Sequence, residues 1–318
     1  MSSKPSIPEV TVGHFYTQHA EALQLKLLAG AGGLNRVIKQ GAVNRPGLAL
    51  AGFYVDFAHD RVQIIGRAET AYLKSLGEDL SRVRLRELFR HNIPCLIFAR
   101  SIVPPKVVLE EAEAENIAVF SSPMTTYRLV NAATICLEMD FAPTTSEHGS
   151  MIDIQGIGIL VRGKSGVGKS ECVLSLIERG HSIVSDDITR FKLIEGRELV
   201  GTASDLTRFH MEVRGLGIIN LASIFGVRSI RLEKTLDLVC TLKDWNEVEN
   251  IERVGMETEY YEILGIKVPH VTIPVRPGRD LASLVEVAAM DQKLKRMGQN
   301  SAVEFNQRLI QSMSKPIR

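Results

Sequence analysis

Residues 163–170 read Gly-Lys-Ser-Gly-Val-Gly-Lys-Ser and match the pattern G-x-x-x-x-G-K-[ST] at every defined position. An apolar, strand-like run precedes this stretch, and a helical pattern over residues 171–179 follows it and ends at Gly180. Glycines let backbone amides turn inward around phosphate oxygens, and the following helix adds the positive end of its dipole. The stretch therefore predicts a P-loop in an α/β domain that binds nucleotide phosphates. A glycine-rich turn that matches by chance is the alternative, and the flanking strand and helix patterns argue against it.

Each residue of the loop is a predicted phosphate-binding residue: Gly163, Lys164, Ser165, Gly166, Val167, Gly168, Lys169 and Ser170. We expect the Lys169 side chain to reach the β and γ phosphates. The Ser170 hydroxyl is expected to bind Mg²⁺, which bridges the same phosphate oxygens and offsets the charge that builds during transfer. The loop thus predicts Mg²⁺-dependent phosphoryl transfer.

Two adjacent carboxylates, Asp186 and Asp187, follow a short strand pattern over residues 182–185. The carboxyl ends of parallel strands lie beside a P-loop crevice, so we expect both aspartates near the phosphates. One could face the Mg²⁺ ion and the other the acceptor hydroxyl as general base, because alternation along a strand points neighbouring side chains apart. The alternative is that both are solvated loop acids or helix caps.

The chain of 318 residues exceeds the size at which one hydrophobic core usually stops growing, so two domains are expected. Apolar strand-like runs alternate with helical patterns at residues 68–76, 105–115 and 125–137 in the first part of the chain. A polar stretch at residues 141–149 contains Pro and Gly and reads as a linker. We therefore predict a small N-terminal α/β domain at residues 1–140 and a P-loop catalytic domain with C-terminal helices at residues 141–318.

The composition excludes several classes of protein. A net charge of +1 supplies no overall field that would attract nucleic acid or an anionic membrane. The longest apolar run, residues 47–55, is far shorter than the ~20 residues that a membrane helix needs, and no secretory signal pattern is visible. The four cysteines stand far apart without zinc-ligand spacing. We expect a cytoplasmic protein with reduced thiols and with neither a nucleic-acid nor a membrane partner.

Further stretches give the chain a specific resemblance. With residues 212–220 (Glu-Val-Arg-Gly-Leu-Gly-Ile-Ile-Asn) and 275–279 (Val-Arg-Pro-Gly-Arg), the P-loop and the paired aspartates resemble the HPr kinase/phosphorylase family. The resemblance extends from residues 44–47 to residues 285–290 and so covers most of the chain. It implies a kinase domain whose nucleotide site is similar to that of phosphoenolpyruvate carboxykinase.

The resemblance also implies an activity. The family uses ATP or pyrophosphate to phosphorylate a serine of HPr, a small phosphocarrier protein of bacterial sugar transport. It removes that phosphate with inorganic phosphate, which yields pyrophosphate, and one site serves both reactions. The family forms homohexamers in which the C-terminal region of one subunit helps a neighbour to hold HPr.

The resemblance assigns roles to particular residues. It implies a catalytic set of His148, Lys169, Asp187 and Arg253, with Asp187 as the proton acceptor and donor. It implies Mg²⁺ contacts at Ser170 and Glu212, and help from Asp186 through the waters of the metal. It also places Arg276 and Arg279 in a loop near the incoming phosphate.

Each of these residues has a plainer reading. His148 would be an exposed histidine of the linker, and Arg253 a solvated surface charge. Glu212 would form a buried ion pair with Arg214 or Arg253. Arg276 and Arg279 would belong to an ordinary loop.

One position departs from the family. Lys164 stands where the family commonly has an acidic residue, so we expect an additional positive charge close to the phosphates.

Two other functions remain open from the residues. A P-loop enzyme that acts on a small metabolite, such as a metabolite kinase or a carboxykinase-like enzyme, would need the same phosphate site. A nucleotide-gated regulatory module would use hydrolysis to switch conformation and would phosphorylate no acceptor. A GTPase switch is disfavoured because the nearest match to its Asn-Lys-x-Asp motif, residues 242–245, lacks the Asn.

Overall fold

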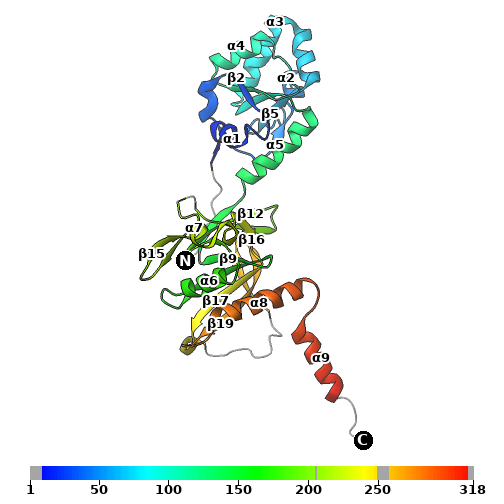
Figure 1. The fold of residues 1–318 in the computed structure, drawn as a ribbon. Helices are drawn as coiled ribbons and strands as arrows, with labels where there is room; N and C mark the ends of the chain where they lie inside the picture. The colour runs from blue at the N-terminus through cyan, green and yellow to red at the C-terminus, as the bar shows by residue number, and fades with distance from the viewer. Residues whose placement is uncertain (1–8, 205, 249–257, 314–318) are drawn as a thin grey trace. The chain divides into compact units, whose positions relative to one another are not determined.

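The structure is a computed structural model that describes residues 9–204, 206–248 and 258–313. Its contacts divide the chain into two units, Ile7–Ala142 and Pro143–Arg318, which are described separately (Figure 1).

The first unit is built on a five-stranded sheet with the order β2-β7-β6-β5-β4. Strands β4 to β7 are parallel to one another, and edge strand β2 runs antiparallel to β7. Both faces of β5 and β6 are buried, as expected for parallel strands covered by helices on two sides. The strands are β2 (Lys26–Ala29), β4 (Val43–Asn44), β5 (Val62–Ile65), β6 (Cys95–Phe98) and β7 (Ala118–Ser121). A separate two-stranded sheet joins β1 (Val10–Thr11) to β3 (Val37–Ile38).

Helices cover both faces of this sheet. Leu96 and Phe98 share a core with α3 and α4, and Cys95 and Ile97 share another with α1 and α5. The predicted helix at residues 68–76 is longer than expected, because a second helical run follows Gly77 directly and continues to Arg90. The helices are α1 (Val12–His19), α2 (Gly47–Leu50), α3 (Arg67–Arg90), α4 (Lys106–Ala114) and α5 (Thr126–Asp140).

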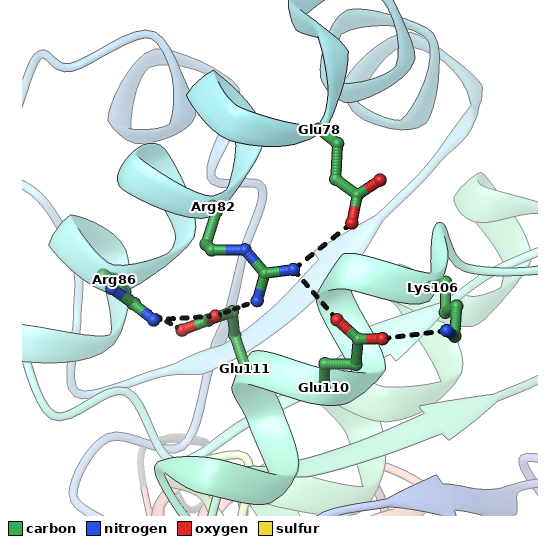
Figure 2. Close-up of polar contacts among 6 residues, drawn as sticks. All are labelled: Glu78, Arg82, Arg86, Lys106, Glu110 and Glu111. Carbon is green, nitrogen blue, oxygen red and sulfur yellow. Dashed lines mark hydrogen bonds and ion pairs between the residues drawn. The ribbon is translucent and has the colours of Figure 1, made fainter.

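A network of ion pairs links α3 to α4. The carboxylate of Glu111 is buried and accepts hydrogen bonds from both Arg82 and Arg86. Arg82 also pairs with Glu78 and Glu110. Figure 2 shows these side chains with Lys106, which pairs with Glu110.

The second unit contains a six-stranded sheet with the order β11-β9-β10-β17-β19-β18. Strands β10, β17 and β19 are parallel. Strand β9 runs antiparallel to both β10 and β11, so β11 points in the same direction as β10. The apolar run expected before the P-loop therefore forms a hairpin of two strands. The strands are β9 (Ser150–Ile154), β10 (Ile157–Gly163), β11 (Ser182–Ser185), β17 (Leu238–Asp244), β18 (Glu259–Ile263) and β19 (Ile266–Val275).

This topology places four strand ends at one edge of the sheet. The carboxyl ends of β10, β11, β17 and β19 lead into the P-loop, Asp186, Trp245 and Arg276 respectively. Helices α6 (Lys169–Glu178) and α8 (Leu281–Arg296) pack on one face, where Val173 and Val285 share a core with Ile159. Helix α9 (Ser301–Met313) follows, so the predicted C-terminal helices are present.

An antiparallel sheet with the order β16-β13-β12-β8 packs against the other face. Its strand β8 corrects the prediction that residues 141–149 form a linker. Thr145 and Glu147 of β8 alternate into the interior, and the strand pairs along its whole length with β12. The strands are β8 (Thr144–His148), β12 (Ile188–Ile194), β13 (Glu198–Thr202) and β16 (Glu233–Thr235).

A short hairpin and three short helical segments complete the unit. They are β14 (His210–Val213) and β15 (Gly217–Asn220), then α7 (Leu221–Phe225), η2 (Val227–Ser229) and η3 (Trp245–Glu247).

Two further properties concern membrane-spanning helices and cysteines. Within the described ranges, no helix combines the length and the apolar character that crossing a bilayer requires. The four cysteines are free thiols, and burial raises the pKa of Cys95 and of Cys172 to about 12.

Candidate functional site

The P-loop adopts a backbone that only glycine allows at its two ends. A side chain at Gly163 would lie 2.6 Å from Val167 Cγ1 and 2.9 Å from the carbonyl oxygen of Leu242. Gly168 is left-handed, with φ of 100°, and α6 begins directly after it. No side chain caps this helix end, so its first amides and its positive dipole end are available to an anion.

The P-loop forms one wall of a cavity of about 420 Å³. This volume lies within the range of about 300–1,000 Å³ that is typical of small-molecule sites. Four predicted residues that are distant in sequence line it together with the loop: His148, Asp186, Asp187 and Glu212. Val167 is the one P-loop residue that does not line it. Glu171 and Arg214, which were not predicted, also contribute.

Lys169 and Asp187 are in direct contact. Lys169 Nζ lies 3.1 Å from Asp187 Oδ1, and the lysine side chain is 14% exposed whereas that of the aspartate is 70% exposed. Asp187 takes a left-handed backbone conformation, with φ of 57°, and its carbonyl oxygen accepts a hydrogen bond from the amide of Gly149. That bond ties Asp187 to the residue after His148, so three predicted residues converge.

Asp186 is half-buried and connects two other segments. Its carboxylate accepts a hydrogen bond from Ser150 Oγ at 2.8 Å and one from the amide of Glu212 at 3.4 Å. Burial raises the pKa of Asp186 above its ordinary value. The two aspartates were expected to point apart, but both line the cavity, because β11 ends at Ser185 and Asp187 turns left-handed.

His148 and Glu212 are both exposed at the cavity. His148 is the last residue of β8, opposite Ile188, and its carbonyl oxygen accepts a hydrogen bond from Arg162 Nε at 3.2 Å. Glu212 stands opposite Ile218 in the β14–β15 hairpin. It forms no ion pair with any residue that the structure describes, so the buried pair with Arg214 suggested as an alternative is not observed.

The ammonium group of Lys164 is paired. Lys164 Nζ lies 2.5 Å from Glu247 Oε1. Lys164 lines the cavity, so its positive charge lies close to the predicted phosphate site, and the carboxylate of Glu247 offsets part of that charge.

Two of the remaining predicted arginines, Arg276 and Arg279, do not line the cavity. The guanidinium of Arg276 lies over the Trp245 ring, 3.1 Å from its centroid. Arg279 donates a hydrogen bond to the carbonyl oxygen of Pro274 at 3.0 Å. Arg253 lies outside the described residues.

The chemistry of the cavity suits Mg²⁺. The hydroxyl of Ser170 and the carboxylate of Glu212 offer oxygen atoms, which a hard cation prefers. No ready-made cluster of three or more metal-ligating side chains occurs among the described residues. Mg²⁺ commonly uses only one or two carboxylates and completes its shell with water and substrate phosphate, so this donor set fits the ion.

Comparisons with known proteins agree along the chain. A family model described as "HPr Serine kinase N terminus" matches residues 10–137, and one described as "HPr Serine kinase C-terminal domain" matches residues 139–309. The HPr kinase/phosphorylase of Leptospira biflexa is 43% identical over 305 residues, which are 95% of this chain and 94% of the relative. That of Geobacter sulfurreducens is 42% identical over 291 residues, 92% of this chain and 91% of the relative.

A solved chain titled "Structure of the Hpr(Ser) kinase/phosphatase from Coxiella burnetii" is 30% identical, with a TM-score of 0.46. The match covers 50% of this chain and 97% of that one. The two family models together span both units, and the curated relatives align over more than nine-tenths of their own length. On this basis the chain belongs to the HPr kinase/phosphorylase family, a family of kinase/phosphorylase enzymes.

Proposed function

We propose that this chain is a bifunctional, Mg²⁺-dependent enzyme that acts on a serine of HPr. In one direction it transfers a phosphoryl group from ATP, or from pyrophosphate, to the serine hydroxyl. In the other direction inorganic phosphate accepts the phosphoryl group from phosphoserine, and pyrophosphate is formed. The single observation that carries the proposal is the contact between Lys169 and Asp187 inside a cavity walled by a P-loop.

The donor phosphates are held by the amides of the P-loop, by the N-terminal end of α6 and by Lys169. Ser170 and Glu212 would hold Mg²⁺, which would offset charge on the phosphate oxygens. Asp186 accepts a hydrogen bond from the amide of Glu212 and so orients that hairpin, and by resemblance to the family it would assist at the metal site. This arrangement positions the phosphoryl group for in-line attack by the serine oxygen.

Asp187 moves the proton in both directions. In the kinase reaction its carboxylate accepts the proton of the serine hydroxyl as the new P–O bond forms and the bond to the leaving phosphate breaks. In the reverse reaction the protonated Asp187 returns that proton to the serine oxygen. Before the donor binds, Lys169 pairs with this carboxylate, so arrival of donor phosphates draws the lysine away and frees the base.

The family assigns three further positions to this reaction. His148 lies on the cavity wall next to Asp187, where it can contact the acceptor or the incoming phosphate. The loop with Arg276 and Arg279 begins at the same edge of the sheet as the P-loop, which suits a supporting role in phosphorolysis. Arg253 completes the catalytic set by resemblance to the family.

The test uses the full chain with ATP, Mg²⁺ and purified HPr, and HPr with its target serine changed to alanine as the matched acceptor. With ATP labelled on its outer phosphate, we expect the label to appear on HPr and not on the alanine variant. Addition of inorganic phosphate should then remove the label from HPr and release pyrophosphate. Label on the alanine variant would remove the serine assignment, and efficient phosphorylation of a small metabolite without HPr would favour the metabolite kinase.

The variant Asp187→Asn tests the shared base. We expect loss of both the kinase and the phosphorylase reactions, with ATP affinity retained in calorimetry. Loss of one direction alone would contradict a single carboxyl that serves both.

The proposal also includes assembly and location. The enzyme is a homohexamer that acts in the cytoplasm, as the family resemblance implies. Light scattering on the full chain checks the assembly, and a monomeric mass at the concentrations of the assay would remove it.

A further inference from the structure

The three cations that line the cavity differ in their partners. Lys164 pairs with Glu247 and Lys169 pairs with Asp187. Arg214 has no carboxylate within ion-pair distance among the described residues, and its Nη2 atom contacts only the neutral hydroxyl of Ser165, at 3.3 Å. Its positive charge is therefore unmatched by any group of the protein that the structure describes.

The β14–β15 hairpin holds Arg214 firmly in this place. Met211, Val213 and Ile219 pack into the core beneath the hairpin. The amide of Glu212 is bonded to Asp186, so the strand that leads to Arg214 is anchored from two sides. The outer face of the hairpin thus presents Glu212 and, two residues later, Arg214 to the cavity.

The guanidinium lies against the P-loop itself. A Cβ atom at Gly166 would stand 3.7 Å from Arg214 Nη1. The hydroxyl of Ser165 lies on the neighbouring position of the loop. Because the backbone amides of a P-loop gather around phosphate oxygens, the cation faces the place where an anion would bind.

We propose that Arg214 binds the outer phosphate of the donor, which is the phosphoryl group that is transferred. The guanidinium lies beside the P-loop and is planar, so it can donate two parallel hydrogen bonds to oxygens of a phosphate that the loop holds. Lys169 is expected to reach both donor phosphates, and Arg214 adds a second cation at the outer one. The inference rests on the proposed function and adds one phosphate-binding residue to it.

Pyrophosphate affinity is the direct test, because it needs neither HPr nor turnover. Calorimetry with Mg²⁺ and pyrophosphate compares the full chain with Arg214→Met and Arg214→Lys. We expect Arg214→Met to bind roughly 10- to 100-fold more weakly, the usual effect of losing a charge-assisted hydrogen bond. Arg214→Lys keeps the charge and loses the planar fork, so its affinity should lie between the two.

Two further variants separate binding from support of the loop. Arg197→Met removes an exposed arginine on the β12–β13 turn, paired with Glu195, and should leave affinity unchanged. Ser165→Ala removes the one described partner of Arg214 and should cost less than about threefold, the scale of a weak neutral hydrogen bond. If Ser165→Ala weakened pyrophosphate binding as much as Arg214→Met, Arg214 would act by supporting the conformation of the P-loop. The inference that it binds phosphate would then be wrong.

The remaining outcomes are also decisive. Unchanged pyrophosphate affinity in both Arg214 variants overturns the inference. It does not contradict the proposal that the chain phosphorylates HPr. A chain that does not phosphorylate HPr, yet binds pyrophosphate in an Arg214-dependent way, supports the inference and removes the proposed acceptor. Thermal melting of each variant identifies any that fail to fold, and Arg214→Lys then carries the comparison.

Discussion

Charged groups are arranged differently in the two units. Between α3 and α4, the buried carboxylate of Glu111 is matched by two arginines, and Arg82 is shared among three glutamates (Figure 2). Around the P-loop, Asp187 is largely exposed, Glu212 has no described ion pair, and the hydroxyl of Ser165 is the one hydrogen-bond partner of Arg214 among the described residues. Charges that satisfy one another hold helices together, whereas unmatched charges in a cavity are available to a ligand. Stability and activity should therefore respond to different substitutions.

The largest expected effect is on activity. Lys169→Met should lower kcat/KM for HPr phosphorylation by roughly 100- to 1,000-fold or more, because the developing charge on the phosphates loses a fixed donor. Its melting temperature should hardly change, since the partner Asp187 is exposed and solvated. Kinase assays and calorimetric melting on the same preparation check both halves. An active Lys169→Met variant with a much lower melting temperature would show that this ion pair serves stability and not activity.

The α3–α4 network should show the opposite behaviour. Glu111→Ala should lower the free energy of unfolding by about 1–3 kcal/mol, because two arginines lose a buried, hydrogen-bonded acceptor. Kinase activity should be retained. Glu110→Ala is the matched control, because Glu110 is on the same helix and shares Arg82 but is 39% exposed. Equal losses from Glu110→Ala and Glu111→Ala in chemical denaturation would mean that burial does not decide the cost.

Asp186 tests the contrast between the two units through the pH dependence of stability. Burial raises its pKa above the ordinary value of 3.8, so the folded state holds this proton at a pH where the unfolded state has released it. The stability that the neutral form contributes is complete below 3.8 and is lost as the pH rises through the raised pKa. The free energy of unfolding of Asp186→Asn should therefore increase relative to the natural chain across that window. Parallel denaturation curves at every pH from 4 to 8 would contradict this.

The smallest effect is expected at Lys164, which pairs with Glu247 near the surface. Lys164→Asp should change the KM for ATP by less than about tenfold and kcat by less still, as the range for exposed ion pairs suggests. Combining it with Glu247→Lys restores opposite charges and should restore the KM. Steady-state kinetics of the two single variants and the double variant test the pair, and an unchanged KM with collapsed turnover would refute it.

Local patterns predict what depends on neighbours in sequence. The strand before residues 163–170, the helix after them and the strand before Asp186 follow from residue periodicity and glycine placement, and the structure confirms these elements. Residues 144–148 look polar and linker-like, yet they form β8, because their partner strand β12 lies beyond the P-loop helix in sequence. A single strand cannot reveal such a partner.

Contacts across the cavity were harder to foresee. Ser150 meets Asp186 only because β9 is inserted between β10 and β11. The pairing of Lys164 with Glu247 depends on the order of β10 and β17 in the sheet. Arg214 had one usable signal, its position two residues after Glu212, but strand alternation does not place it, because β14 ends at Val213 and Arg214 lies in the turn that follows.

The β9–β10 ribbon sets where the chain can be lengthened. Its turn, at Gln155 and Gly156, lies at the end remote from the cavity, whereas His148 and the P-loop lie at the other end. Residues added within the turn lie outside the paired strands, whereas one added at Gly149 would move Ser150 and Met151 each to the face opposite the one it now occupies. A fluorescent or affinity tag can therefore be placed in the turn, as a handle that reports on the enzyme without disturbing its chemistry.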